Sequence, residues 1–155
     1  MLNKIAAEQK QTMQQENEKK KAYLQSYKHY KQTARRLEEQ LEELRLNEMF
    51  PSLMMSDMPS SHNQKDLSDY IVKYDELISE IIRLRYDAIQ RFEEVRQQIE
   101  LLEDENEKTV LTLRYLRNDT WEGICVKMDY SWKQIHRIHA NALQNFQIKM
   151  KDDIE

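Results

Sequence analysis

The sequence predicts an all-α protein in which a long antiparallel coiled-coil helical hairpin is followed by a small C-terminal helix-turn-helix domain. Two long segments repeat apolar residues with alternating spacings of four and three, as supercoiled helices do. Three short segments with helical apolar spacing follow them. One glycine, two prolines and 34% charged residues are also typical of a mostly helical chain.

The first repeat lies within a predicted helix over residues 3–46, and the second lies within a predicted helix over residues 64–105. The apolar seam of the first helix consists of Tyr23, Tyr27, Tyr30, Ala34, Leu37, Leu41 and Leu44. That of the second consists of Leu67, Ile71, Tyr74, Ile78, Ile81, Ala88, Phe92, Val95, Ile99 and Leu102, interrupted only at Arg85.

Both prolines, Pro51 and Pro59, lie between the two repeats. Because proline stops a helix, this segment allows the chain to reverse its direction. We therefore expect residues 1–105 to form the hairpin, with its loop at residues 47–63.

The two arms of this hairpin do not match in apolar character. Residues 92–102 continue the seam, whereas residues 9–20 opposite them are rich in Gln, Glu and Lys. An uncovered aliphatic seam costs about 25 cal/mol per Å² relative to burial. Either the C-terminal domain folds back over it or a second chain covers it. We favour a homo-oligomer through the coiled coil, because long coiled coils often associate with a second copy of themselves.

The C-terminal domain is expected to span residues 106–151 and to contain three helices. The first ends near Asn118, and its apolar face is formed by Val110, Leu111, Leu113 and Leu116. Thr120 is a plausible N-cap of the second helix, which places Trp121, Ile124 and Met128 on one face. A helix of about two turns, a short turn and a longer helix match the helix-turn-helix motif.

The third helix begins after the break at Asp129 and Tyr130. Ser131 caps it, and Gln134 three residues later completes a capping box. Asp129 in the turn tolerates the left-handed backbone conformation better than most residues. We expect the third helix to run over residues 131–149 and to act as the recognition helix.

Positive charge is segregated onto this last helix. The whole chain carries a net charge of −4, yet residues 131–151 include lysines and an arginine and no acid. Such side chains neutralise phosphate and, with Gln and Asn, read base edges in the major groove. The first two turns of a recognition helix reach the bases. The predicted DNA-binding residues are Ser131, Trp132, Lys133, Gln134, His136, Arg137, Asn141 and Lys149.

Within this set, we expect Trp132, Lys133, His136 and Arg137 to reach the bases, and Ser131, Gln134 and Asn141 to face the DNA backbone. For Trp132, contact with a thymine methyl or a sugar and packing on Tyr130 or a partner chain stay open as alternatives. Residues 152–155 form an acidic tail, which we expect to point away from DNA. The pattern alone also fits an ordinary three-helix bundle with a solvated basic face.

A resemblance to a known family strengthens the DNA-binding interpretation. The segment VLTLRYLRNDTWEGICVKMDYSWKQIHRIHANAL, residues 110–143 and about a fifth of the chain, resembles the promoter-reading region 4 of bacterial sigma factors. The resemblance implies base contacts by Trp132, Lys133 and Arg137, and phosphate contacts by Ser131, Gln134 and His136. The sequence departs from the family at Gly123, where an acid is usual, and at Asp129, where glycine is favoured.

With the preceding coiled coil and the segment Ser56-Asp57-Met58-Pro59, the chain resembles small phage and prophage late-gene transcriptional regulators of the ArpU/RinA-like type. The resemblance implies a sequence-specific transcriptional regulator that binds promoter-proximal double-stranded DNA, with RNA polymerase as a further candidate partner. Two alternatives remain open, namely a DNA-packaging adaptor like a terminase small subunit and a sigma-like protein-interaction module. Oligomeric state separates the first of these from a regulator.

Other functional classes have little support in the sequence. We find no Gly-rich phosphate loop, no H-E-x-x-H and no Cys-His metal spacing, so we expect neither an enzyme nor a bound cofactor or metal. His136 and His139 lack a third ligand nearby. The single cysteine, Cys125, excludes an intrachain disulfide and is expected to be buried. With no membrane-length apolar run and no signal-peptide core in residues 1–12, we expect a cytoplasmic protein.

Overall fold

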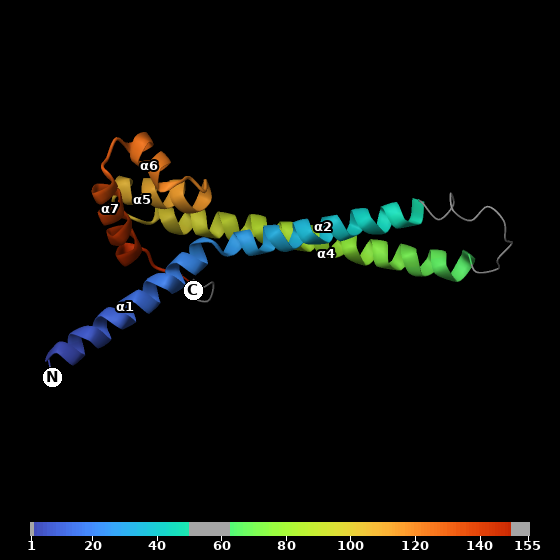
Figure 1. Cartoon of the computed structure of the whole chain (residues 1–155), viewed down its shortest axis with the longest axis horizontal. Coiled ribbons are helices and arrows are strands. Elements are labelled where there is room, and N and C mark those ends of the chain that lie inside the picture. Colours follow the sequence, from blue (N-terminus) through green and yellow to red (C-terminus); the bar gives the residue numbers. More distant parts are fainter. Residues whose placement is uncertain (1, 50–62, 150–155) are drawn as a thin grey trace. The chain divides into compact units, whose positions relative to one another are not determined.

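A computed structural model shows a chain built of helices (Figure 1). It describes residues 2–49 and 63–149, and within these ranges it contains no strand, so the all-α prediction is confirmed there. Among the described helices, none is both long and apolar enough to cross a membrane. The elements are α1 (Leu2–Leu24), α2 (Ser26–Met49), α4 (Asn63–Glu100), α5 (Glu105–Leu111), the π-helix η1 (Thr112–Leu116), α6 (Trp121–Met128) and α7 (Trp132–Asn145).

The first arm is not the single helix that the sequence predicted, because it breaks at Gln25 between α1 and α2. The hydroxyl of Ser26 donates a hydrogen bond of 2.6 Å to the carbonyl oxygen of Tyr23. A side-chain hydroxyl on a helical carbonyl competes with the backbone ladder and often bends a helix. The predicted loop at 47–63 also shortens, since α2 reaches Met49 and α4 starts at Asn63. Its prolines and the acidic tail lie outside the described residues.

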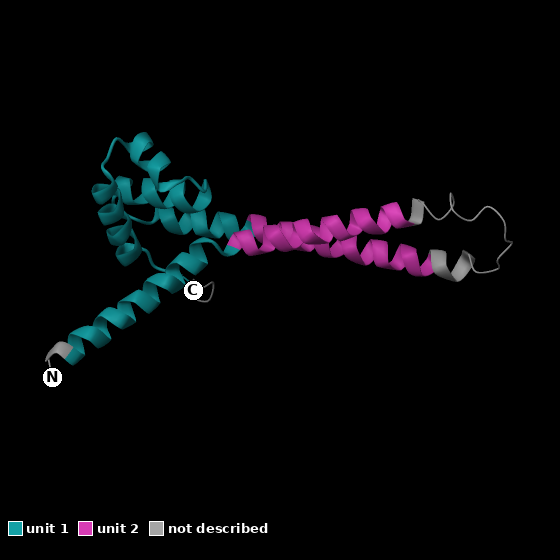
Figure 2. Cartoon of the chain, in the orientation of Figure 1, with its two compact units in different colours: residues 1–26, 90–155 teal, residues 27–89 magenta. Residues whose placement is uncertain are grey.

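The chain divides into two compact units, coloured separately in Figure 2. Unit 1 contains residues 1–26 and 90–155, and unit 2 contains residues 27–89. Residues 1–26 and 90–105, which the sequence analysis assigned to the hairpin, therefore share a unit with the C-terminal helices. The helix α4 contributes to both units.

In unit 2, α2 and α4 run side by side in opposite directions (Figure 1). Apolar residues at the predicted seam positions are buried between them, namely Tyr27, Ala34, Ile81 and Ala88, together with Leu84. Arg85, which interrupts the predicted seam, donates two hydrogen bonds of 2.7 Å to the carboxylate of Glu38 on α2. A bidentate ion pair thus joins the two helices where the apolar repeat fails.

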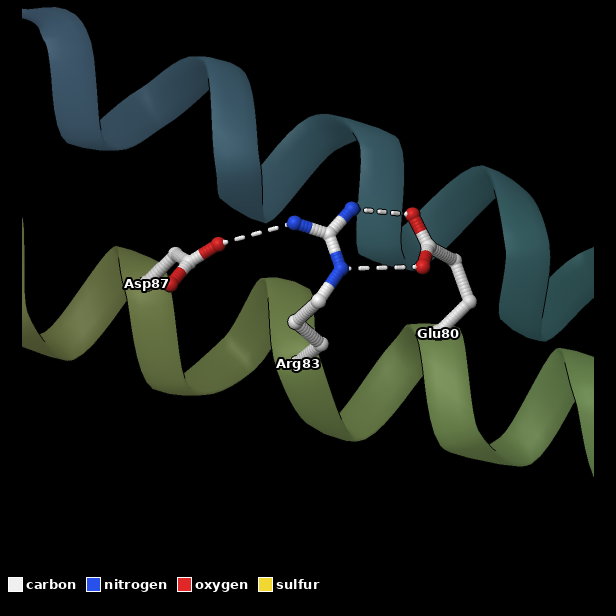
Figure 3. Close-up of polar contacts among 3 residues, drawn as sticks. All are labelled: Glu80, Arg83 and Asp87. Carbon is white, nitrogen blue, oxygen red and sulfur yellow. Dashed lines mark hydrogen bonds and ion pairs between the residues drawn. The ribbon is translucent and has the colours of Figure 1, made fainter.

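A second arginine of α4 is paired within its own helix. The guanidinium of Arg83 donates hydrogen bonds to the carboxylates of Glu80 and Asp87, one turn away on either side (Figure 3). Pairs at these spacings stabilise a helix by about 0.2–0.5 kcal/mol each. The carboxylates of Glu80 and Asp87 thus neutralise the charge of Arg83 within α4.

The larger core of unit 1 covers the part of the α4 seam that the sequence left without a partner. Val95, Ile99 and Leu102 are almost fully buried. They pack with residues of α1, α5, η1 and α7 and with the residue that follows α7, namely Leu24, Leu111, Tyr115, Ala142, Leu143 and Phe146. The chain's own C-terminal helices therefore cover this seam, and the second chain that we favoured is not needed for that purpose.

A smaller core holds α5, η1, α6 and α7 together. It consists of Val110, Leu113, Ile124 and Ile135, with Trp121, Cys125, Met128, Tyr130 and Ile138 packed against it. Cys125 is only partly buried, which corrects the expectation of full burial. Val110, Leu113, Trp121, Ile124 and Met128 of this core belong to the apolar faces that the sequence predicted for the first two C-terminal helices.

The ends of the short helices are fixed by side-chain caps. The side chain of Asp104 caps α5, and that of Thr120 caps α6 by accepting from Gly123 N at 3.1 Å. Asp129 ends α6 in the left-handed conformation, with φ 56° and ψ 42°. The predicted cap at Thr120 and the predicted turn at Asp129 are thus confirmed.

Gly123 lies in the first turn of α6, and its role differs from the loosening that an interior glycine causes. A Cβ at this position would come within 3.2 Å of the capping hydroxyl of Thr120. The missing side chain therefore leaves room for the cap.

Candidate nucleic-acid interface

The capping box that the sequence predicted at the start of α7 is present. Ser131 N donates to Gln134 Oε1 at 2.9 Å, and Gln134 N donates to Ser131 Oγ at 3.3 Å. Both residues are exposed. This reciprocal pair satisfies backbone donors at the helix start and fixes where the first turn of α7 begins. The amide NH₂ of Gln134 is not used by the cap.

Two cations on the outer face of α7 stand without a neutralising partner. Lys133 and Arg137 are exposed, four residues apart, and neither has a hydrogen bond or ion pair within the part of the chain that the structure describes. Asn141, one turn further on, is exposed in the same way. These three predicted residues share one face, because residues at i and i+4 lie one above the other on a helix.

Several other cations of unit 1 have partners within the chain. Lys127 pairs with Asp119 at 2.6 Å, and Lys108 pairs with Glu105 at 2.7 Å. The guanidinium of Arg114 lies 4.5 Å from the ring centroid of Trp121. Lys133 and Arg137 of α7 instead remain available for an anion outside the chain.

Trp132 heads a stack of rings that runs inward from the surface. Its indole is 51% exposed, and its centroid lies 4.6 Å from that of His136. The His136 ring lies 4.6 Å from Trp121, which carries Arg114 on its ring. Among the alternatives left open for Trp132, packing on Tyr130 is replaced by packing on His136, and half of the indole remains exposed.

The stack places His136 less favourably for DNA than the sequence suggested. Its Nε2 atom is buried and has no hydrogen-bond partner among the described residues. An unsatisfied buried nitrogen costs free energy, which the ring contacts with Trp121 and Trp132 offset. The ring therefore serves mainly to support Trp132, and the predicted base or phosphate contact by Nε2 is blocked in this arrangement.

His139 lies deeper, in a buried polar pair with η1. Its Nε2 shares a hydrogen bond of 2.9 Å with the hydroxyl of Tyr115. Burial lowers the pKa of His139 to about 4, with smaller contributions from Lys21, His136 and Arg114. Burial likewise raises the pKa of Tyr115 to about 12. Both groups are neutral at pH 7, so this pair specifies the packing of α7 on η1 without adding charge.

The far end of α7 is held by partners from two other helices. The ammonium of Lys20 on α1 is nearly buried and donates to the carbonyl of Leu143 at 2.8 Å and that of Gln144 at 3.4 Å. The amide of Asn145 donates to both carboxylate oxygens of Glu107 at 3.0 and 3.1 Å. A cation on the last carbonyls of a helix complements its dipole.

The helix predicted over residues 131–149 is shorter in the structure, because α7 ends at Asn145. Phe146 takes an extended conformation, with ψ 130°, and is fully buried in the larger core. Lys149 N then donates to Gln98 Oε1 at 3.1 Å. The exposed side chain of Lys149 thus lies beside the end of α4, apart from the face that carries Lys133 and Arg137.

Sequence reasoning did not find the residues that support this face. Arg114, Lys20 and Glu107 lie on elements far from α7 in the chain, and each is recognised only by its contact. Among the residues that support this face, the sequence pointed only to Trp121, an aromatic residue at the start of α6 that packs against the smaller core. Among the described residues, no group of three His, Cys, Asp or Glu could hold a metal ion.

A comparison with protein-family models places this chain in a family. Residues 50–147, more than half of the chain, match the model described as "Protein of unknown function (DUF1492)". The chain therefore belongs to the DUF1492 family. The match includes α4 and all of the C-terminal helices up to Gln147. No curated protein and no solved structure matches the chain.

Proposed function

We propose that this chain is a sequence-specific DNA-binding transcriptional regulator of the phage and prophage type, which binds promoter-proximal duplex DNA through α7. In this proposal α6, the turn at Asp129 and α7 act as a helix-turn-helix like that of sigma region 4. The helices α2 and α4 act as a coiled-coil hairpin that presents the domain or contacts RNA polymerase. Double-stranded DNA is the principal partner, and the compartment is the cytoplasm.

The single observation that supports this proposal most strongly is the pair of free cations on α7. Lys133 and Arg137 project from a helix whose opposite face is buried through Ile135 and Ala142. Phosphate neutralisation by such side chains supplies most of the affinity of DNA-binding proteins. A rigid helix with a capped start also fixes where these charges lie, which limits the entropy lost on binding.

Six of the eight predicted DNA-binding residues have the following roles in the proposal. Arg137 and Lys133 read base edges from the major groove, where arginine recognises guanine through O6 and N7. Ser131, Gln134 and Asn141 donate to the DNA backbone, which sets the register of the helix on the duplex. Lys149, held beside α4, contacts a phosphate flanking the site.

A binding experiment with the full chain tests the proposal. Duplexes that the protein selects from a random pool are labelled, and their affinity is measured by fluorescence anisotropy against a scrambled duplex at two salt concentrations. We expect tighter binding to the selected duplex. We also expect the logarithm of the binding constant to fall with the logarithm of the salt concentration, with a slope of about −0.9 for each phosphate contacted. Equal affinity for both duplexes would contradict sequence-specific recognition, and no binding at low salt would contradict DNA binding.

The two alternatives predict different outcomes in the same preparation. A packaging adaptor related to terminase small subunits would form a ring of many copies, whereas a regulator would be a monomer or dimer by light scattering. A sigma-like protein-interaction module would bind no duplex at any salt concentration. The unneutralised charge of Lys133 and Arg137 favours the DNA-binding classes over that module.

A further inference from the structure

We propose that the outward face of Trp132 reads the 5-methyl group of a pyrimidine in the major groove. This inference rests on the proposed function of α7 as a DNA-reading helix. It adds a chemical preference that the charges of Lys133 and Arg137 do not supply, namely for thymine or 5-methylcytosine over their unmethylated counterparts.

The position of Trp132 suits such a contact. It is the first residue of α7, directly after the capping residue Ser131. The N-terminal residues of a recognition helix are those that contact base edges. Its neighbour in the sequence, Lys133, is one of the two free cations. Both residues lie in the first turn of α7, so a duplex that receives the start of this helix in its major groove would meet the indole as well as the ammonium group.

The indole is held in place before any ligand arrives. His136 lies 4.6 Å behind it, and Trp121 lies 4.6 Å behind His136. The guanidinium of Arg114 closes the stack at 4.5 Å from the Trp121 ring. A side chain that is already fixed loses little entropy when it binds. The exposed face of the Trp132 indole is therefore a preorganised apolar surface.

The chemistry of the major groove offers one apolar group to such a surface. Guanine, cytosine and adenine edges present hydrogen-bond donors and acceptors, whereas thymine also presents its C5 methyl group. Methylated cytosine carries the same group on the same carbon. An aromatic side chain that is 51% exposed gains from burying this methyl.

The expected size of the effect follows from one buried methyl group. Burial of one such group corresponds to about a fourfold change in affinity. The measurement replaces each thymine of the selected duplex by uracil, which removes only the methyl group. We expect about fourfold weaker binding of the wild-type chain at one or two positions, and no change at the others.

Two protein variants connect the effect to the indole. The quantity compared is the thymine-to-uracil ratio, which is the affinity for the thymine duplex divided by that for the uracil duplex. In Trp132→Ala, this ratio should fall to one at the sensitive positions. In Lys133→Ala, the overall affinity should fall while the ratio stays near four. A Trp132→Phe variant keeps an aromatic ring and should keep most of the ratio, which guards against a loss of folding in the alanine variant.

A second arm distinguishes the source of the methyl group. At a sensitive position rebuilt as a C·G pair, 5-methylcytosine should bind more tightly than cytosine by a similar factor. If only the thymine pair responds, thymine is the source of the methyl that Trp132 reads.

Different results of these binding measurements would contradict this inference and the proposed function. Sequence-specific binding with a thymine-to-uracil ratio of one at every position would overturn the methyl contact alone. A ratio that survives in Trp132→Ala would overturn it as well. A chain that binds no duplex would overturn the proposed function, and Trp132 would then be better explained as a contact for a protein.

Discussion

The two arginines of α4 in unit 2 and the single arginine of α7 in unit 1 are used in opposite ways. Arg83 and Arg85 are paired with carboxylates of the chain itself. Arg137 has no such partner among the described residues, although it is exposed to a comparable degree. The number of positive charges on a helix therefore says less about ligand binding than whether the chain has already neutralised them.

The C-terminal core of unit 1 and the outer face of α4 in unit 2 differ in how deeply their apolar residues are buried. Unit 1 encloses Ile124, Ile135 and Phe146 completely. In unit 2, Ile82, Tyr86 and Ile89 on α4 each remain more than 60% exposed. Changes in unit 1 should therefore alter stability strongly, while equivalent changes on the outer face of α4 should not.

The largest expected effect contrasts a buried and an exposed isoleucine. Ile135→Asp places an unpaired carboxylate in the smaller core of unit 1 and should cost about 4 kcal/mol or more, which unfolds that core. Ile82→Asp adds the same group on exposed α4 and should change stability by about 0.5 kcal/mol or less. Thermal unfolding followed by near-ultraviolet circular dichroism measures both. Equal losses of stability in the two variants would contradict the expected difference between the buried and the exposed position.

A matched pair of arginine variants tests the contrast in charge use. Arg137→Ala should weaken binding to the selected duplex by about 1–3 kcal/mol and relax specificity at one base pair. Arg85→Ala breaks only the ion pair with Glu38 and should leave DNA affinity unchanged. Anisotropy titrations on selected and scrambled duplexes measure both variants. Should Arg137→Ala weaken both duplexes equally, its base-reading role would be wrong.

The buried pair of His139 and Tyr115 makes unit 1 sensitive to pH. His139 has a pKa of about 4 when folded and about 6.5 when unfolded, so the unfolded chain binds the extra proton. Stability is therefore fully present above pH 6.5 and falls as the pH drops toward 4. The expected loss between pH 7.5 and pH 5 is about 2 kcal/mol.

Chemical denaturation of the wild-type chain at these two pH values measures this loss. The variant His139→Gln should show a much smaller difference, because its side chain does not titrate. The exposed His29 provides the control, since His29→Gln should retain the full pH dependence. A pH dependence that persists in His139→Gln would assign it to other groups.

The smallest expected effect concerns the start of α7. Ser131→Ala removes one half of the capping box and should cost about 1 kcal/mol of stability. Because the cap also fixes the first turn, DNA affinity should fall slightly in parallel. Denaturation and anisotropy measured on one preparation check both quantities. Unchanged stability would contradict the capping role of Ser131, and unchanged affinity would contradict its proposed contact with the DNA backbone.

Local patterns in the sequence predicted much of this structure. The caps at Thr120 and Ser131 and the left-handed Asp129 follow from side-chain chemistry within a few residues. The buried faces of the C-terminal helices follow from apolar spacing. These features depend on near neighbours, so the order of residues is enough to identify them.

Features that depend on distant contacts were missed. The end of α7 at Asn145 arises because Phe146 fills the larger core, although helical spacing alone would continue. The partners of the candidate site, such as Lys20 on α1, are more than a hundred residues away in the chain. The covering of Val95 and Ile99 likewise required the folded position of the C-terminal helices.

The central claim is that the exposed face of α7 meets duplex DNA, and backbone amide shifts measure this most directly. The full chain, labelled with ¹⁵N, is titrated with the selected duplex. We predict the largest shifts in residues 131–141, with little change in α2 and the unit 2 part of α4. Shifts that concentrate on α2 and α4, or no shifts at all, would contradict the account.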